Sequence, residues 1–220
     1  MKKTLLLIPL VVGCSYSAFG SACGTDTLTD YISEGSCTIG DLTFSGFAYN
    51  SSDMGGGLVP STDGITVSVA SMGGETGLLF NSLWTAGTGQ SVDSTITYDV
   101  TTTNPGGITD LDLMIVGGAA GSGVATAAET SFTPPLSLFT EYGPGTVIPS
   151  DSTLIIPPVD SLSLQKDIGV TGGSTAGGAH ISDVYNLFSE GTSTVPEPST
   201  LLLCAGVLAF IPIARRKFVH

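Results

Sequence analysis

Short runs of alternating apolar and polar residues are the main signal in this chain. Within 94–102, Ile96, Tyr98 and Val100 alternate with threonines and an aspartate, and the segment 65–70 repeats the pattern. Successive side chains of a β-strand point to opposite faces of a sheet. Each run therefore predicts a strand with one buried and one solvated face.

Similar runs recur along most of the chain, separated by clusters of glycine, serine and threonine. Further strand candidates lie at 38–49, 77–80, 111–115, 124–132, 136–139, 153–156, 161–170 and 179–188. Residues 27–33 predict one or two helical turns that end at Gly35. No alternation of strands with helices and no fixed-period repeat is present. The pattern predicts an all-β, two-sheet sandwich of Greek-key or jelly-roll type.

Three stretches inside the body are expected to be loops between strands rather than domain boundaries. They are the glycine-rich segment 117–123, the segment around Pro134-Pro135 and the segment around Pro157-Pro158. The glycine-rich segment has no following lysine and no helical pattern, which argues against a phosphate-binding loop.

The N-terminus has the features of a secretory signal peptide. Met1-Lys2-Lys3 is a basic start, residues 5–12 form an apolar segment too short to span a bilayer, and small residues follow in Ala18-Phe19-Gly20. We expect a signal peptide at 1–20. Two alternatives stay open: cleavage after Ala22, or lipoprotein processing that leaves Cys14 lipidated.

The C-terminus combines a stiff tether, an apolar segment and a basic end. Pro-Glu-Pro cannot form helix interior, because proline lacks the amide proton and restricts the residue before it. The apolar run 201–214 prefers hydrocarbon, but its 14 residues would span only about 21 Å as a helix, short of the roughly 30 Å of a bilayer core. The basic cluster orients the chain end toward the cytoplasm. The residues concerned are Val195, Pro196, Glu197 and Pro198 in the tether and Arg215, Arg216 and Lys217 at the end.

In motif, order and position this tail resembles the PEP-CTERM sorting signal of Gram-negative, biofilm-forming bacteria. The resemblance implies an exosortase-type processing peptidase as partner, a transient stay in the inner membrane, and a final place at the cell surface or in the extracellular matrix beside exopolysaccharide. The body also resembles one group of PEP-CTERM proteins of unknown function, through segments 23–25, 35–41, 89–96, 166–170 and 181–188. That resemblance implies one exported β-rich domain and supplies no catalytic residues.

These readings divide the chain into four parts. They are a signal peptide at 1–20, a β-sandwich domain at 21–189, a tether with the Pro-Glu-Pro motif at 190–198, and a transmembrane sorting helix with its basic tail at 199–220.

The body is strongly acidic. All but one of the 19 acidic residues lie within 21–194, whereas Lys166 is the only one of the six basic residues found there, which leaves about −17 for the body against −13 for the whole chain. A surface without cations repels nucleic acid and anionic lipid headgroups. We expect no nucleic-acid partner. Without a dense ligand loop, the carboxylates predict at most weak Ca²⁺ binding.

Cysteine usage agrees with export. Cys23 and Cys37 are the only cysteines between the two terminal segments, an even number in an oxidising compartment. A bridge between them would close a loop of about 15 residues and stabilise the fold by on the order of 3 kcal/mol. We predict this disulfide.

Candidate chemistry is sparse, and we expect no catalytic residue, metal or cofactor. His180 is the only histidine of the body and is expected to be an ordinary strand residue. Asp110 and Asp112 fall on one face of a strand, and a glycan-active enzyme could use such a pair, but solvated turn and strand residues are the ordinary explanation. Trp84 could stack on sugar rings, although core or rim packing explains it better because it follows the buried-looking run Leu78-Leu79-Phe80. The other aromatic residues of that kind are Tyr49, Tyr98, Tyr142 and Tyr185.

Three functions remain, in order of expectation. The first is a non-enzymatic structural or adhesive protein of the cell surface or extracellular matrix, associated with exopolysaccharide. The alternative is a carbohydrate-binding module. The third is a glycan-active enzyme.

Overall fold

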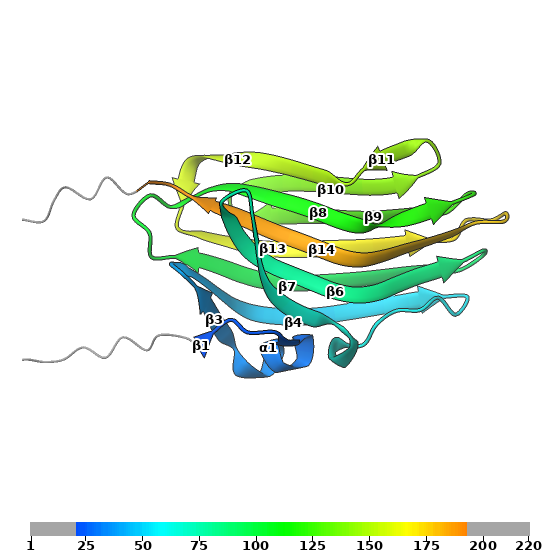
Figure 1. The fold of residues 1–220 in the computed structure, drawn as a ribbon, viewed down its shortest axis with the longest axis horizontal. Helices are drawn as coiled ribbons and strands as arrows, with labels where there is room; N and C mark the ends of the chain where they lie inside the picture. Colours follow the sequence, from blue (N-terminus) through cyan, green and yellow to red (C-terminus); the bar gives the residue numbers. More distant parts are fainter. Residues whose placement is uncertain (1–20, 193–220) are drawn as a thin grey trace, which may run out of the picture.

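The computed structural model describes residues 21–192, which fold into two β-sheets packed face to face (Figure 1). Sheet A has eight strands in the order β1-β3-β4-β7-β13-β9-β10-β11. Their bounds are β1 Ser21–Ala22, β3 Ser36–Ile39, β4 Leu42–Met54, β7 Ser91–Thr102, β13 Ser161–Thr171, β9 Val124–Phe132, β10 Pro135–Gly143 and β11 Thr146–Ile148.

Sheet B has six strands in the order β12-β8-β14-β6-β5-β2. Their bounds are β12 Ser150–Val159, β8 Ile108–Ala120, β14 Gly178–Glu190, β6 Glu75–Gly87, β5 Thr66–Met72 and β2 Asp26–Thr27. Strand β14 lies between β6 and β8, so the last strand of the described chain completes the centre of this sheet. The predicted all-β, two-sheet sandwich is confirmed.

The alternation that predicted the strands also builds the core. In β7, Ile96, Tyr98 and Val100 are buried between the sheets, as predicted, and they lie beside inward residues of β13 such as Leu164. Large aromatic side chains fill the space: Tyr98 stacks on Phe47 with ring centroids 5.5 Å apart. Each fully buried apolar side chain of this size stabilises the fold by roughly 1.5–3 kcal/mol.

The N-terminal segment is fixed to sheet A by a disulfide. Cys23 and Cys37 are bonded, with their Cα atoms 4.8 Å apart, as the sequence predicted. The short strand β1 pairs in parallel with β3, and the amide of Cys23 donates to the carbonyl of Thr38. The bridge therefore holds the first described residues against the edge of the sheet.

One short helix closes the sandwich on the β4 side (Figure 1). Helix α1 (Leu28–Glu34) begins at a capping box in which Thr27 and Asp30 each bond the other's backbone amide. It ends at Gly35, whose φ of 84° is a conformation that glycine adopts without strain. The helix predicted at 27–33 is confirmed within one residue at each end. A 3-10 turn, η1 (Thr62–Gly64), lies beside it.

The prediction that the glycine-rich and proline-rich segments are loops is partly wrong. Residues 117–120 of the glycine-rich segment continue strand β8, and only the end of that segment forms a turn. Pro157 and Pro158 lie inside β12, where pairing with β8 is interrupted between Leu154 and Val159. Proline is tolerated there because an edge strand with a bulge needs no ladder amide at those positions. Pro135 begins β10 and only Pro134 stays in the turn.

Several sequence predictions concern residues outside 21–192, so the structure does not describe them. These are the signal peptide, the Val195–Pro198 motif, the apolar run and the Arg215-Arg216-Lys217 cluster. Within the described range, no helix has the length and apolar character needed to span a membrane. The described chain begins and ends at the same end of the sandwich (Figure 1).

The disulfide gives a first prediction. Changing Cys23 and Cys37 together to serine should lower the free energy of unfolding by about 3 kcal/mol, because the bridge restricts a loop with a sequence separation of 14 in the unfolded chain. Denaturant unfolding measures the difference, and unfolding of the unchanged protein in reductant should reproduce it. Two free thiols in freshly isolated protein would contradict the prediction.

Candidate functional site

Of the aromatic residues that could stack on sugars, two lie in the core, and Tyr185 is half-buried on β14 opposite Met114. Trp84 and Tyr98 are buried in the core, with 0% and 1% of their surfaces exposed. The indole nitrogen of Trp84 donates to the Ser94 hydroxyl at 3.1 Å, and the Tyr49 hydroxyl donates to the Pro60 carbonyl at 2.7 Å. Tyr142 packs against the core from its edge. The expectation that Trp84 serves packing is confirmed.

His180 is exposed on β14, as expected of an ordinary strand residue. Glycine and threonine lie opposite it on the neighbouring strands, Gly118 on β8 and Thr85 on β6.

The outer face of sheet B carries a cluster of three carboxylates. Asp110 and Asp112 of β8 lie on this face, as their spacing predicted, and Glu75 joins them from the start of β6. One carboxylate oxygen of each residue lies within 4.8 Å of the other two. Ser189 of β14 lies between them: its amide donates to Asp110 Oδ1 at 2.9 Å, and its hydroxyl lies 3.3 Å from Glu75 Oε1.

This proximity changes the ionisation of Glu75. A hydrogen bond with Asp112 raises the pKa of Glu75, and partial burial and the charges of Asp112 and Asp110 raise it further, from 4.5 to about 7. The hydroxyl of Ser189 acts in the opposite direction. Glu75 therefore keeps its proton at mildly acidic pH.

A pocket of about 480 Å³ lies beside the carboxylates, and we call it the acidic pocket. Apolar and polar side chains alternate around it, because it spans the outer face of β8 and its neighbours. Its lining comprises Met72, Gly73, Glu75, Asp112, Leu113, Met114, Ser150, Asp151, Ser152 and Leu187.

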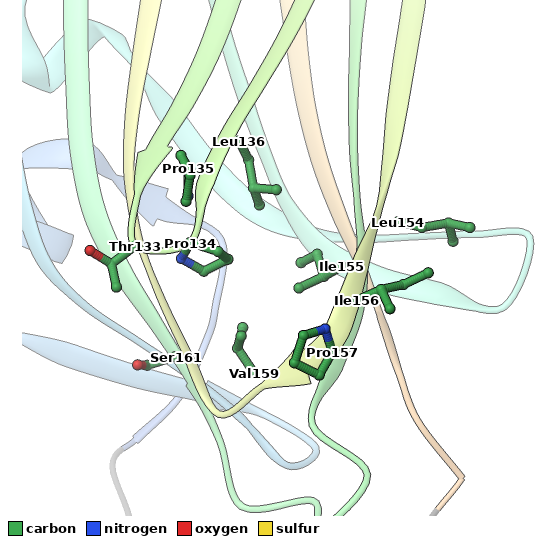
Figure 2. A pocket seen from close by; sticks show the side chains of 10 residues that line it. All are labelled: Thr133, Pro134, Pro135, Leu136, Leu154, Ile155, Ile156, Pro157, Val159 and Ser161. Atoms are coloured by element: carbon green, nitrogen blue, oxygen red, sulfur yellow. The ribbon is translucent and has the colours of Figure 1, made fainter.

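A second pocket, of about 520 Å³, has a different character (Figure 2). The turn around Pro134 and Pro135 faces Ile155 and Val159 of β12 across it, and no titratable side chain lines it. We call it the proline pocket; the hydroxyls of Thr133 and Ser161 are its only polar side-chain groups. Leu154 and Ile156, which point away from this pocket in Figure 2, are 69% and 84% exposed.

The carboxylate cluster suits a divalent cation only weakly. Its three residues offer three close oxygen atoms, whereas Ca²⁺ takes six to eight oxygen ligands. A cation bound here would keep most of its water, in agreement with the weak Ca²⁺ binding expected from the sequence.

Glu75 is the residue of the carboxylate cluster that was not predicted from the sequence. The two glycines before it, Gly73 and Gly74, both have positive φ and form the turn between β5 and β6. That signal places Glu75 at the first position of a strand. It does not place the strand near Asp110, because β6 reaches β8 only through β14.

Comparison with known proteins shows little beyond the fold. No known protein family and no curated protein matches the chain. Several solved structures are distantly similar, among them the following three. TmCBM61 in complex with beta-1,4-galactotriose is 15% identical over 63% of this chain and 86% of its own, with a TM-score of 0.30. A family 11 carbohydrate-binding module from Clostridium thermocellum, in complex with a mixed-linked tetrasaccharide, is 12% identical over 79% of this chain and 100% of its own, with a TM-score of 0.26.

The third is the enzymatically active domain of tailspike protein 4 from bacteriophage CBA120, 14% identical over 64% of this chain, with a TM-score of 0.29. This chain spans only 19% of the tailspike chain. Similarity this low agrees with a β-sandwich and carries no argument about function.

Glu75 gives a prediction about pH. The unfolded chain releases this proton near pH 4.5 and the folded chain near pH 7, so between these values the folded state binds more protons. For this group, stability is highest below the unfolded pKa and falls as pH rises through 7. Between about pH 5 and pH 8, the thermal midpoint of the unchanged protein should therefore fall by about 3 °C more than that of Glu75→Gln. This figure allows for solvent screening of the partly exposed carboxylate.

The matched control is Asp53→Asn, which removes an exposed carboxylate from β4 on the other sheet. Its pH profile should parallel that of the unchanged protein. Equal slopes for Glu75→Gln and the unchanged protein would show that Glu75 ionises normally.

Proposed function

We propose that the described domain is a carbohydrate-binding module of an exported surface or matrix protein, and that glycans bind at the acidic pocket. The observation that carries the proposal is the lining of this pocket, which combines carboxylates and hydroxyls with apolar side chains. A sugar ring presents the same mixture, with hydroxyl groups around its rim and C–H groups on its faces.

The polar part of the pocket supplies hydrogen-bond acceptors. Asp112 offers carboxylate oxygens at its surface, and Ser150 and Ser152 offer hydroxyls. Asp151 also lines the pocket, but its two oxygens already accept hydrogen bonds from the backbone amides of Phe139 and Ser152. Ionised carboxylates accept hydrogen bonds roughly twice as strong as neutral acceptors do. They can therefore replace the water that sugar hydroxyls lose on binding.

The apolar part comes from Met72, Met114 and Leu187. Methionine is flexible and polarisable and adapts to irregular surfaces, which suits the C–H faces of a sugar when no aromatic ring is available. Polar groups that fix the orientation of a ligand beside an apolar contact surface are typical of small-molecule sites.

The setting agrees with export. A disulfide-bonded β-sandwich suggests an extracytoplasmic domain, because such bonds persist in oxidising compartments. The proposal includes a signal peptide at 1–20, a sandwich of Greek-key or jelly-roll type, and sorting through the tail that resembles a PEP-CTERM signal.

A structural or adhesive matrix role without a glycan site is the second candidate. The body's charge of about −17 favours it, since such a surface stays soluble and resists self-association in a matrix. This role predicts the same export and the same tail, and differs only in the acidic pocket. The proposal contains no catalytic step.

Calorimetric titration with the host's exopolysaccharide tests the glycan site. The unchanged full chain should bind, and Asp112→Asn should weaken binding about 10-fold, because a charge-assisted hydrogen bond contributes roughly 1.5–3 kcal/mol. Asp53→Asn, with the same change of charge on sheet A, should leave the affinity unchanged. No heat of binding, or equal losses in the two variants, would favour the structural role instead.

The tail gives a separate prediction. We propose that residues 199–220 hold the chain in the inner membrane only until an exosortase-type peptidase cuts near Pro196–Pro198. The apolar run is too short for a stable span and would thin the bilayer or lean on its flanking residues. The intact mass of surface-exposed protein should therefore lack residues 201–220.

The basic cluster supplies the matched test of orientation. The precursor should stay uncut when Arg215, Arg216 and Lys217 are changed together to glutamate. The charge-conserving variant Arg215→Lys, Arg216→Lys and Lys217→Arg should be cut normally. Surface protein that retains the tail would show that it is a plain membrane anchor.

A further inference from the structure

The centre of the sandwich holds three polar side chains in contact with one another. Lys166, Glu129 and Asn186 are all 0% exposed. The Lys166 amine donates to Glu129 Oε2 and to Asn186 Oδ1. The side-chain amide of Asn186 donates to the same Glu129 oxygen at 2.5 Å. One carboxylate oxygen therefore touches both the amine and the amide nitrogen.

Strand register brings this cluster together from both sheets. Lys166 of β13 and Glu129 of β9 are direct partners in sheet A, and both occupy inward positions of alternating strands. Asn186 occupies an inward position of β14 in sheet B. The amine of Lys166 reaches across the core, since it lies 5.7 Å from the ring centre of Phe80 on sheet B.

A permanent ion pair explains these residues poorly. Burying two charges costs several kcal/mol each unless their hydrogen bonds are complete. An ammonium has three protons to donate, but the amine contacts two acceptors in the described protein. Among the described residues, no donor reaches Glu129 Oε1, and the neighbouring Tyr98 hydroxyl makes no hydrogen bond.

We propose that Lys166 and Asn186 form an intramolecular isopeptide bond, promoted by Glu129, which joins the two sheets covalently. The ingredients are a primary amine, a carboxamide within its reach, a carboxylate that touches both nitrogens, and a dry, fully buried setting.

The step balances without a cofactor or an oxidant. The ion pair first returns one proton from the amine to Glu129, which leaves a neutral nucleophile. The Lys166 Nζ lone pair attacks Asn186 Cγ, and the Nζ–Cγ bond forms. Glu129 delivers the proton that it holds to Nδ2 and, again a carboxylate, takes one from Nζ. The Cγ–Nδ2 bond breaks and ammonia leaves, so that Glu129 ends protonated and nothing is oxidised or reduced.

The surroundings favour each part of this step. Burial lowers the pKa of the Lys166 amine, an effect that the Glu129 carboxylate offsets only in part. Burial also raises the pKa of the Tyr98 phenol, and Glu129 raises it further, so this neighbour keeps its proton. The product is an uncharged amide, which suits an apolar core better than an ion pair does.

The sequence offers an unusually direct test. Lys166 is the only lysine or arginine between residues 4 and 214, so trypsin has one cleavage site in this whole span. Trypsin requires a free basic side chain and cannot cut after an acylated lysine. The purified full chain, denatured and with its disulfide reduced, should stay uncut at Lys166, and its mass should be lower by one ammonia, about 17 Da.

Digestion before aspartates locates the bond. A peptide that begins at Asp160 and ends at Lys166 should be joined to one that begins at Asp183 and contains Asn186. Loss of ammonia by cyclisation of an asparagine would give the same mass but leave Lys166 open to trypsin, so cleavage and mass together separate the two. Complete tryptic cleavage after Lys166 at unchanged mass would overturn the proposal.

Two variants test the roles of the residues. Glu129→Gln keeps the shape of the side chain but removes the base, and it should restore both the full mass and cleavage after Lys166. Lys166→Arg keeps the positive charge without a reactive amine. This variant should also have the full mass, and trypsin should cut it after position 166. A cross-link that persists in Glu129→Gln would overturn the role of Glu129. If either variant fails to fold, the result for the unchanged chain still decides whether the bond exists.

Discussion

The fold depends on the way in which its core accommodates one lysine. Lys166 is the only basic residue between the two terminal segments, and it lies at the centre of the sandwich rather than on the acidic surface. Its partners, Glu129 and Asn186, come from both sheets, so the sheets must keep one relative position for the cluster to form. An unpaired buried charge would cost about 3–5 kcal/mol, a large share of the roughly 5–15 kcal/mol by which a typical domain is stable. Apolar packing drives the two sheets together, whereas this cluster specifies how they meet.

The same alternation of residues separates the inner chemistry from the outer chemistry. Along β8, Leu111 and Leu113 point into the core, while Asp110 and Asp112 stand on the outer face and meet Glu75 from β6. Carboxylates on this face contact solvent, and they do not disturb the core. The acidic pocket and the buried cluster therefore belong to opposite faces of one sheet, with β14 contributing Leu187 to the first and Asn186 to the second.

Local features of the sequence predicted local features of the structure. Alternation predicted the strands, the spacing of Asp110 and Asp112 predicted their common face, and Cys23 and Cys37 were predicted to pair. Sheet order was not predictable, because it depends on contacts between distant segments, such as β14 between β6 and β8. The sequence does contain one sign of the buried cluster. Lys166 takes an inward position between Leu164 and Ile168 in an alternating strand, where an apolar residue is expected. The small residues Ala125 and Ala127 on β9 take inward positions near it, next to Glu129.

We propose above that a covalent bond joins the sheets at this cluster, and the chemical state of the Lys166 side-chain nitrogen tests this claim most directly. Nuclear magnetic resonance of protein labelled with ¹⁵N at the lysine side chain distinguishes an amide, with one attached proton, from an amine or ammonium. We predict one lysine side-chain signal in the amide region, correlated with the side-chain carbonyl carbon of Asn186. A spectrum in which every lysine nitrogen is an amine or ammonium would contradict the account and leave an ion pair as the link between the sheets.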